Sequence, residues 1–215
     1  MHPLSAHQIL RIWEIGQNQH PLDRALTLLA FACPEIPPPQ LASLSIGQRD
    51  AYLLTLREIT FGQKINGLAE CPNCSDRLEF DLNISDIRVA EISSPKVEIY
   101  KLLSEGVELQ FRLPNSEDLA AIVGYKDVKI ANSLLIQRCI LQATSSGNSL
   151  TYNDLSTVII NQLVGQMAQC DPQAEILLNL SCPACKHSWQ LLFDIVSFFW
   201  TELTARAKRL LQEVH

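Results

Sequence analysis

An α+β fold is predicted by three features of the sequence. Two Cys-Pro-x-Cys motifs, at 71–74 and 182–185, each lie between short segments expected to be strands, and polar and apolar residues alternate in 77–82. Such alternation is typical of half-buried strands. Residues 75–181 separate the motifs, and helical periodicity covers much of this stretch and both ends of the chain. We therefore expect a split β core with N-terminal helices, an inserted helical lobe and a C-terminal helix.

The two motifs together predict a single metal site. Each turn aims two thiolates at one point, and two turns supply the four sulfurs that close a tetrahedral zinc site. We expect Cys71, Cys74, Cys182 and Cys185 to hold one structural zinc ion. The β core would then be a zinc ribbon split by the insertion. A thiol-exchange role is the competing interpretation, but no thioredoxin-like pattern precedes either motif.

The other candidate ligands are interpreted as bystanders. Cys33, Cys139 and Cys170 have no partner at a diagnostic spacing, and each lies in an apolar, helix-like stretch. We expect them to be inert buried thiols. His187 follows the second motif closely, but four cysteines already fill a tetrahedron. We therefore expect it beside the site rather than in it.

The N-terminal region, residues 1–62, is predicted to be helical. Ser45 and Gln48 form the capping box of its last helix, and Gly62 ends that helix. Three consecutive prolines cannot continue a helix, so 34–39 is expected to be a stiff extended connector. The predicted helices are 5–16, 22–33 and 46–61.

Three stretches follow, with two halves of the ribbon on either side of an insertion. Residues 63–114 are predicted to hold the first half of the ribbon plus a hairpin, and residues 173–194 the second half. The ribbon strands are expected beside the cysteine motifs, at 63–70, 77–83, 175–180 and 188–193, and period-two alternation marks 77–82. The hairpin strands are expected at 97–103 and 107–113. The helical insertion spans 115–172, with a loop at 145–149 and helices at 116–123, 126–143 and 154–169.

The C-terminal segment, 195–215, is predicted to be a helix that starts beside Asp194. Its buried stripe is expected to comprise Val196, Phe199, Leu203, Ala207, Leu210 and Val214. Phe199 and Trp200 are expected to cover the ribbon as core. Phe198 projects roughly opposite the stripe and would mark a docking surface if it is exposed.

Two arginines of the capped helix invite two interpretations. Arg49 and Arg57 are eight residues apart, so they lie on similar faces, and acids follow each of them. We favour a solvent-facing edge of ion pairs. A contact with a partner protein or with the ribbon is the alternative.

Composition excludes several classes of function. The chain has 215 residues, of which 47% are hydrophobic and 19% charged, as expected of a globular protein. No apolar run approaches the roughly 18 residues of a membrane span. The N-terminus lacks the features of a signal peptide, so we expect a reducing cytoplasm. The chain shows no catalytic motif and no phosphate-binding glycine loop, which predicts no enzyme activity and no small-molecule substrate.

A nucleic-acid-binding zinc ribbon is the rival function that the residues leave open. The chain carries 17 Lys and Arg against 23 Asp and Glu, a net charge of −6. Zinc held by four thiolates would add further negative charge. Neither cysteine motif lies in a basic stripe with interleaved aromatics. These features argue against nucleic acid as a partner.

Several short motifs, taken in order, resemble one protein family. They cover nearly the whole chain and include Trp13-Glu14, Gly47-Gln48-Arg49-Asp50, Leu56-Arg57-Glu58, Arg112-Leu113-Pro114, Asp118-Leu119, His187-Ser188-Trp189, Phe199-Trp200 and both cysteine motifs. In this respect the chain is similar to the baseplate hub assembly chaperones of T-even-like contractile-tailed phages and of related bacterial contractile injection systems.

The resemblance implies a non-enzymatic assembly factor that acts in the cytoplasm. Its partners would be baseplate hub or spike proteins. The paired cysteines of the family match the four cysteines named above. One departure concerns the turns, because glycine often follows the second cysteine of a knuckle in such sequences, whereas this chain has Ser75 and Lys186.

Overall fold

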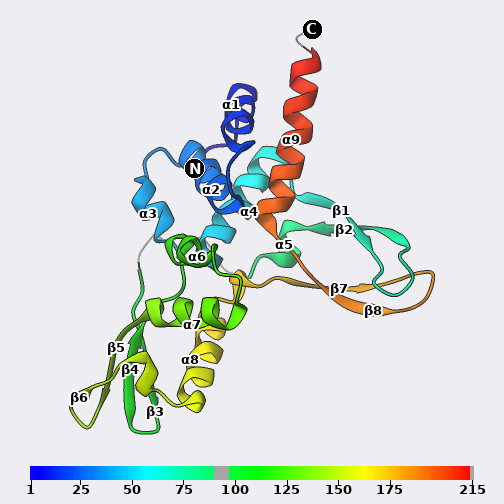
Figure 1. Cartoon of the computed structure of the whole chain (residues 1–215). Helices are drawn as coiled ribbons and strands as arrows, with labels where there is room; N and C mark the ends of the chain where they lie inside the picture. Colours follow the sequence, from blue (N-terminus) through cyan, green and yellow to red (C-terminus); the bar gives the residue numbers. More distant parts are fainter. Residues whose placement is uncertain (90–96, 214–215) are drawn as a thin grey trace.

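A helical body forms one end of the molecule. The computed structural model describes residues 1–89 and 97–213 (Figure 1). The body consists of α1 (Ala6–Gly16), α2 (Pro21–Ala32), α3 (Pro38–Ala42), α4 (Ile46–Phe61) and α9 (Ile195–Glu213). Helix α9 packs against α1, α2 and α4, so the last helix of the chain completes the N-terminal region.

Two separate β-hairpins extend from this body toward one side (Figure 1). The first is antiparallel β1 (Lys64–Glu70) and β2 (Arg77–Asn83), and it ends at the short helix α5 (Ile84–Ile87). The second is antiparallel β7 (Leu177–Ser181) and β8 (Ser188–Leu192). Mixed helix and strand content confirms the α+β class. The strands that were predicted around both cysteine motifs are present, with ends that differ by a few residues.

A lobe built on a sheet lies between the two hairpins in sequence. Its antiparallel strands follow the order β3 (Tyr100–Ser104), β4 (Val107–Phe111), β5 (Ile140–Ser145) and β6 (Asn148–Ser149). Its helices are α6 (Ser116–Ile122), α7 (Val128–Cys139) and α8 (Thr157–Cys170), with single 3₁₀ turns η1 (Tyr152–Asp154) and η2 (Pro172–Ala174). Strand β5 pairs with β4, so the sheet unites residues that sequence analysis had assigned to 63–114 and to 115–172.

One prediction about the lobe was wrong. The helix expected over 126–143 ends at Cys139, because Ile140 has extended backbone angles and starts β5. The loop expected at 145–149 is present but shorter, as the turn at Ser146 and Gly147 between β5 and β6. Leu141, Gln142 and Ala143 favour helices locally, but Gln142 and Ala143 pair with β4, and Ala143 is buried in the core.

The prediction for the proline connector was also wrong in part. Pro38 and Pro39 form the first turn of α3 instead of continuing an extended segment. Proline is tolerated there because the first N–H groups of a helix have no partner within the helix.

The core of the helical body is where α9 meets α1, α2 and α4. Phe199 is fully buried, with its ring edge-on to Phe61 at 5.8 Å between centroids. The Trp200 ring lies against Gly16 so closely that a Cβ there would come within 2.3 Å of it. Trp200 therefore packs on α1 rather than on the ribbon. The predicted stripe of α9 is buried from Val196 to Ala207, Leu210 is half-buried, and Val214 lies outside the described residues.

The arginines of α4 do not form a solvent-facing edge. Arg49 is 5% exposed and Arg57 is 2% exposed. Arg57 instead forms a bidentate ion pair with Glu202 of α9, with Nε–Oε2 and Nη2–Oε1 distances of 2.8 and 2.6 Å. Phe198 is half-buried rather than free, because its ring contacts Phe193 and lies 5.9 Å from the Arg57 guanidinium.

Candidate metal centre

Both cysteine motifs form the same turn at the tip of a hairpin. In the first, the Cys71 N–H donates to the Asp76 carbonyl at 2.9 Å, and the Ser75 N–H donates back to the Cys71 carbonyl at 2.9 Å. Strand β1 enters this turn and β2 leaves it, with Glu70 opposite Arg77 in the register. The turn therefore holds the two sulfurs of the motif on one side of the hairpin tip.

The second motif repeats this pattern. The Cys182 N–H donates to the His187 carbonyl at 2.8 Å, and the Lys186 N–H donates to the Cys182 carbonyl at 3.0 Å. Both Ser75 and Lys186 have a left-handed backbone, with φ of 57° and 61°. These are the two positions at which glycine would be the unstrained residue.

The structure brings all four predicted cysteines together. Their Sγ atoms lie within 4.8 Å of one another, and the shortest contacts cross between hairpins. Cys71 and Cys185 are 3.6 Å apart between Sγ atoms, as are Cys74 and Cys182. Each hairpin contributes one buried cysteine, and the second cysteine of each motif is more accessible. Four thiols in this arrangement could hold one metal ion.

The thiols differ in how readily they ionise. A hydrogen bond from the Asn73 side chain and one from the His187 backbone N–H lower the pKa of Cys185 to about 6. For Cys74, the hydrogen bond with the Asp76 backbone lowers the pKa, but hydrogen bonding with Cys185, burial and the other thiols outweigh it and raise the pKa to about 12. A bound cation would favour ionisation of all four thiols.

The residues that were predicted to be bystanders lie outside this cluster. Cys33 and Cys139 are buried, and Cys170 is half-buried. Burial raises the pKa of Cys139 to about 12, so this thiol is unreactive. The exposed His187 ring stacks on Trp189 at 6.2 Å between centroids. Among the described residues, the four-sulfur group contains no histidine.

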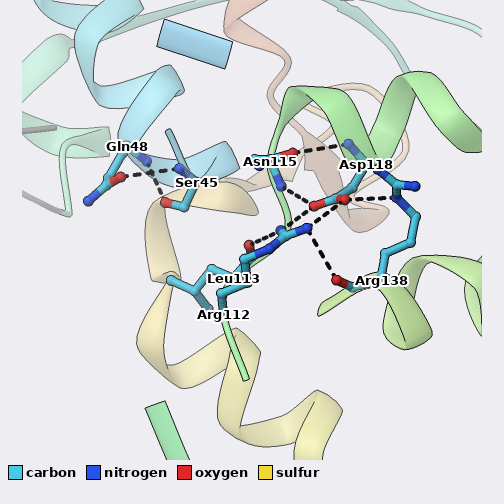
Figure 2. Close-up of polar contacts among 7 residues, drawn as sticks. All are labelled: Ser45, Gln48, Arg112, Leu113, Asn115, Asp118 and Arg138. Atoms are coloured by element: carbon cyan, nitrogen blue, oxygen red, sulfur yellow. Dashed lines mark hydrogen bonds and ion pairs between the residues drawn. The ribbon is translucent and has the colours of Figure 1, made fainter. Parts of the chain in front are cut away.

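A second polar cluster fixes the lobe, and Figure 2 shows that it converges on Asp118. This carboxylate is fully buried and accepts hydrogen bonds from Arg112, from Arg138 and from the Asn115 backbone N–H. Burial alone would raise its pKa, but these donors outweigh burial and hold the pKa of Asp118 below its usual value. Arg112 and Asp118 belong to the motifs of the family resemblance, and Asp118 is also a first-turn acid of α6, but no pattern in the sequence predicted Arg138.

The same cluster adjoins the joint between the lobe and the helical body. Ser45 and Asn115 form an isolated antiparallel bridge, and the Ile46 N–H donates to the Pro114 carbonyl at 3.1 Å. Asp171 accepts from the Gly47 N–H, at the first turn of α4, at 2.9 Å. These contacts set the position of the lobe and therefore the path of the chain into the second hairpin.

Comparison with known proteins identifies the family. A family model described as T4 bacteriophage base plate protein matches residues 13–200, which include both hairpins, the lobe and the first turns of α9. The chain belongs to this family. No curated protein and no solved structure matches it at a significant level.

Both clusters described above lie within the segment that matches the baseplate family. The matched segment includes Cys71, Cys74, Cys182 and Cys185 and the Asp118 cluster. The chain is thus a phage baseplate-related protein whose two hairpins meet at a possible metal site. Among the described residues, no helix combines the length and apolarity that a membrane crossing requires.

Proposed function

We propose that this chain is a non-enzymatic assembly chaperone or scaffold for the baseplate hub of a phage-like contractile injection system. It would act in the cytoplasm, through contacts with hub or spike proteins. The observation that carries the proposal is the baseplate family match over residues 13–200. The four-sulfur cluster supports a rigid platform, because it joins two hairpins that are distant in sequence.

Zinc is the ion that we propose for the cluster. Tetrahedral zinc with Zn–S bonds of about 2.3 Å requires sulfurs about 3.8 Å apart. The two cross-hairpin contacts of 3.6 Å are close to this value. Four cysteine thiolates also form the soft donor set that zinc prefers, and they leave no open position for catalysis. Zinc would therefore be structural, with Cys71, Cys74, Cys182 and Cys185 as its ligands.

Co-expression with defined partners tests the proposed function. The tagged chain is produced with the hub and spike proteins of the same particle, and complexes are identified by size-exclusion chromatography and mass spectrometry. We expect a complex with at least one of them and faster formation of soluble hub when the chain is present. Hub proteins that assemble equally well without the chain would contradict the proposal.

A salt titration separates this function from nucleic-acid binding. We expect no binding to DNA or RNA at micromolar protein concentration, because the chain is acidic. Tight binding that weakens steeply with salt would instead indicate contacts to phosphates and would favour the rival function.

A further inference from the structure

Two adjoining hollows line one side of the lobe and its joint with the helical body. The first, of about 280 Å³, lies between α7 and α8 and is lined by Leu135, Val164 and Met167, among others. The second, of about 250 Å³, is lined by Ile46, Ala168 and Met167. Both include Pro114 and Met167, so they adjoin, and we call the two together the α7–α8 groove.

Helix α8 gives this groove an unusual floor. None of its fourteen residues, Thr157–Cys170, carries a charge. Its buried side, with Leu163 and Met167, packs into the lobe, whereas Val164 is 43% exposed in the groove. Ala168, one turn further along α8, lines the second hollow beside Met167. An apolar, open floor of this kind suits the apolar face of a second helix.

The charges in the groove are confined to one end. Among the described residues that line it, only Asp171 and Glu175 are charged. Asp171 is already engaged by the Gly47 N–H. Glu175 has no hydrogen bond or ion pair with any described side chain, so its carboxylate is available. The groove therefore matches a partner with a long apolar face and a cation at one end.

We propose that the α7–α8 groove binds an amphipathic helix of a hub or spike protein, with a Lys or Arg of that helix against Glu175. This inference rests on the proposed function and adds the surface and the chemistry of the partner. The helix would contact both the lobe and the first turn of α4, because Pro114 and Ile46 line the groove together. Binding would brace the joint that the Ser45–Asn115 bridge forms.

Two aspartate substitutions on the same helix test the groove. Val164→Asp places a charge on the apolar floor, and Val158→Asp places it on a part of α8 that does not line either hollow. The two valines are 43% and 50% exposed, so both variants should fold, which circular dichroism and thermal melting verify. Binding of the full chain to each purified hub and spike protein is measured by calorimetry. We expect Val164→Asp to raise Kd at least about tenfold, and Val158→Asp to leave it unchanged.

A charge reversal and a crosslink provide independent readouts. Glu175→Lys should raise Kd several-fold and abolish the salt dependence of wild-type binding. A photo-crosslinking amino acid at position 164 should label a partner segment with helical apolar spacing and a basic residue, and the same group at 158 should not. Failure of Glu175→Lys to change binding would overturn the assignment of the cation.

The remaining outcomes distinguish the groove from the proposed function. If wild type and Val164→Asp bind a hub or spike protein equally, the groove assignment is wrong and the function stands. If no hub or spike protein binds the wild-type chain, both proposals fall. If the chain alone dimerises in light scattering and Val164→Asp makes it monomeric, a second copy occupies the groove and the proposed partner is wrong.

Discussion

At the scale of single residues, both knuckles place an ordinary side chain where glycine is favoured. Ser75 and Lys186 have φ of 57° and 61°, and the N–H of each donates to the backbone carbonyl of the first cysteine of its turn. A left-handed backbone costs a non-glycine residue roughly 1–2 kcal/mol. The turns nevertheless form, because their hydrogen bonds are complete. Ser75 and Lys186 therefore add strain to the turns without preventing these hydrogen bonds.

Replacing these residues with glycine should stabilise the protein. We expect Ser75→Gly and Lys186→Gly each to raise the free energy of unfolding by about 0.5–1 kcal/mol, the relief of strain less the added entropy of the unfolded chain. Urea denaturation of the metal-loaded protein measures this change in the free energy of unfolding. Ser181→Gly, in the extended strand β7, is the control and should destabilise. If all three variants are destabilised equally, the left-handed backbone of Ser75 and Lys186 is not strained.

The buried carboxylate of Asp118 should make stability depend on acid. The pKa of Asp118 is held below its usual value in the folded state. Its contribution to the free energy of unfolding is therefore complete above about pH 4 and is lost as the pH falls through the folded-state pKa. Asp118→Asn should cost about 3–5 kcal/mol at pH 7, because Arg112 loses its buried partner. The difference in free energy of unfolding between wild type and Asp118→Asn, measured by urea titration, should become smaller below pH 4. A gap that stays constant with pH would show that Asp118 is not charged in the fold.

At the scale of elements, α4 and α9 are joined by a buried ion pair. The Arg57 guanidinium contacts Glu202 through two hydrogen bonds and also donates to the Gly62 carbonyl at 2.6 Å. It thereby fixes the end of α4, the start of the first hairpin and the last helix relative to one another. Helix α9 is thus a structural part of the body from which the two hairpins extend.

Removing this arginine should be far more damaging than removing an exposed one. Arg57→Ala should lower the free energy of unfolding by about 3–5 kcal/mol, because a carboxylate loses its partner in a mostly buried setting. Arg11→Ala removes an exposed pair with Glu14 on α1 and should cost less than about 0.5 kcal/mol. Chemical denaturation of both variants gives the comparison. If both variants lose similarly little free energy of unfolding, the Arg57–Glu202 ion pair does not stabilise the packing of α4 on α9.

Elements that depend on local patterns were predictable, and those that depend on distant partners were not. The strands of both hairpins were expected because they flank the cysteine turns, and alternation marked β2. Helix α4 follows from its Ser45 capping box, which the structure contains. Strand β5 was not predicted because it forms by pairing with β4, which is distant in the sequence. Local periodicity carries no information about such a partner. The burial of Arg57 was missed because Glu202, on the last helix, is its partner. The four cysteines could be grouped because cysteine spacing identifies ligand pairs wherever they lie in the sequence.

At the scale of the whole molecule, the sulfur cluster closes a loop through the lobe. The two hairpins form separate two-stranded sheets, and an isolated two-stranded hairpin is marginally stable in water. The contacts between Cys71 and Cys185 and between Cys74 and Cys182 join their tips. A shared ion would therefore stabilise both hairpins at once, and loss of any ligand should release both.

Metal removal should test this coupling directly. We expect one zinc ion per chain by native mass spectrometry, and a large drop in melting temperature with chelator, since structural zinc contributes about 10–16 kcal/mol of apparent binding energy in small domains. Cys71→Ser and Cys182→Ser should lose the metal equally, although they lie in different hairpins. Cys170→Ser, outside the cluster, should retain it. Because Trp189 is on β8, its fluorescence should change when Cys71 of the other hairpin is replaced. Two ions per chain, or a Trp189 signal that is indifferent to Cys71, would show that the hairpins bind metal separately and that the platform is not held by one shared site.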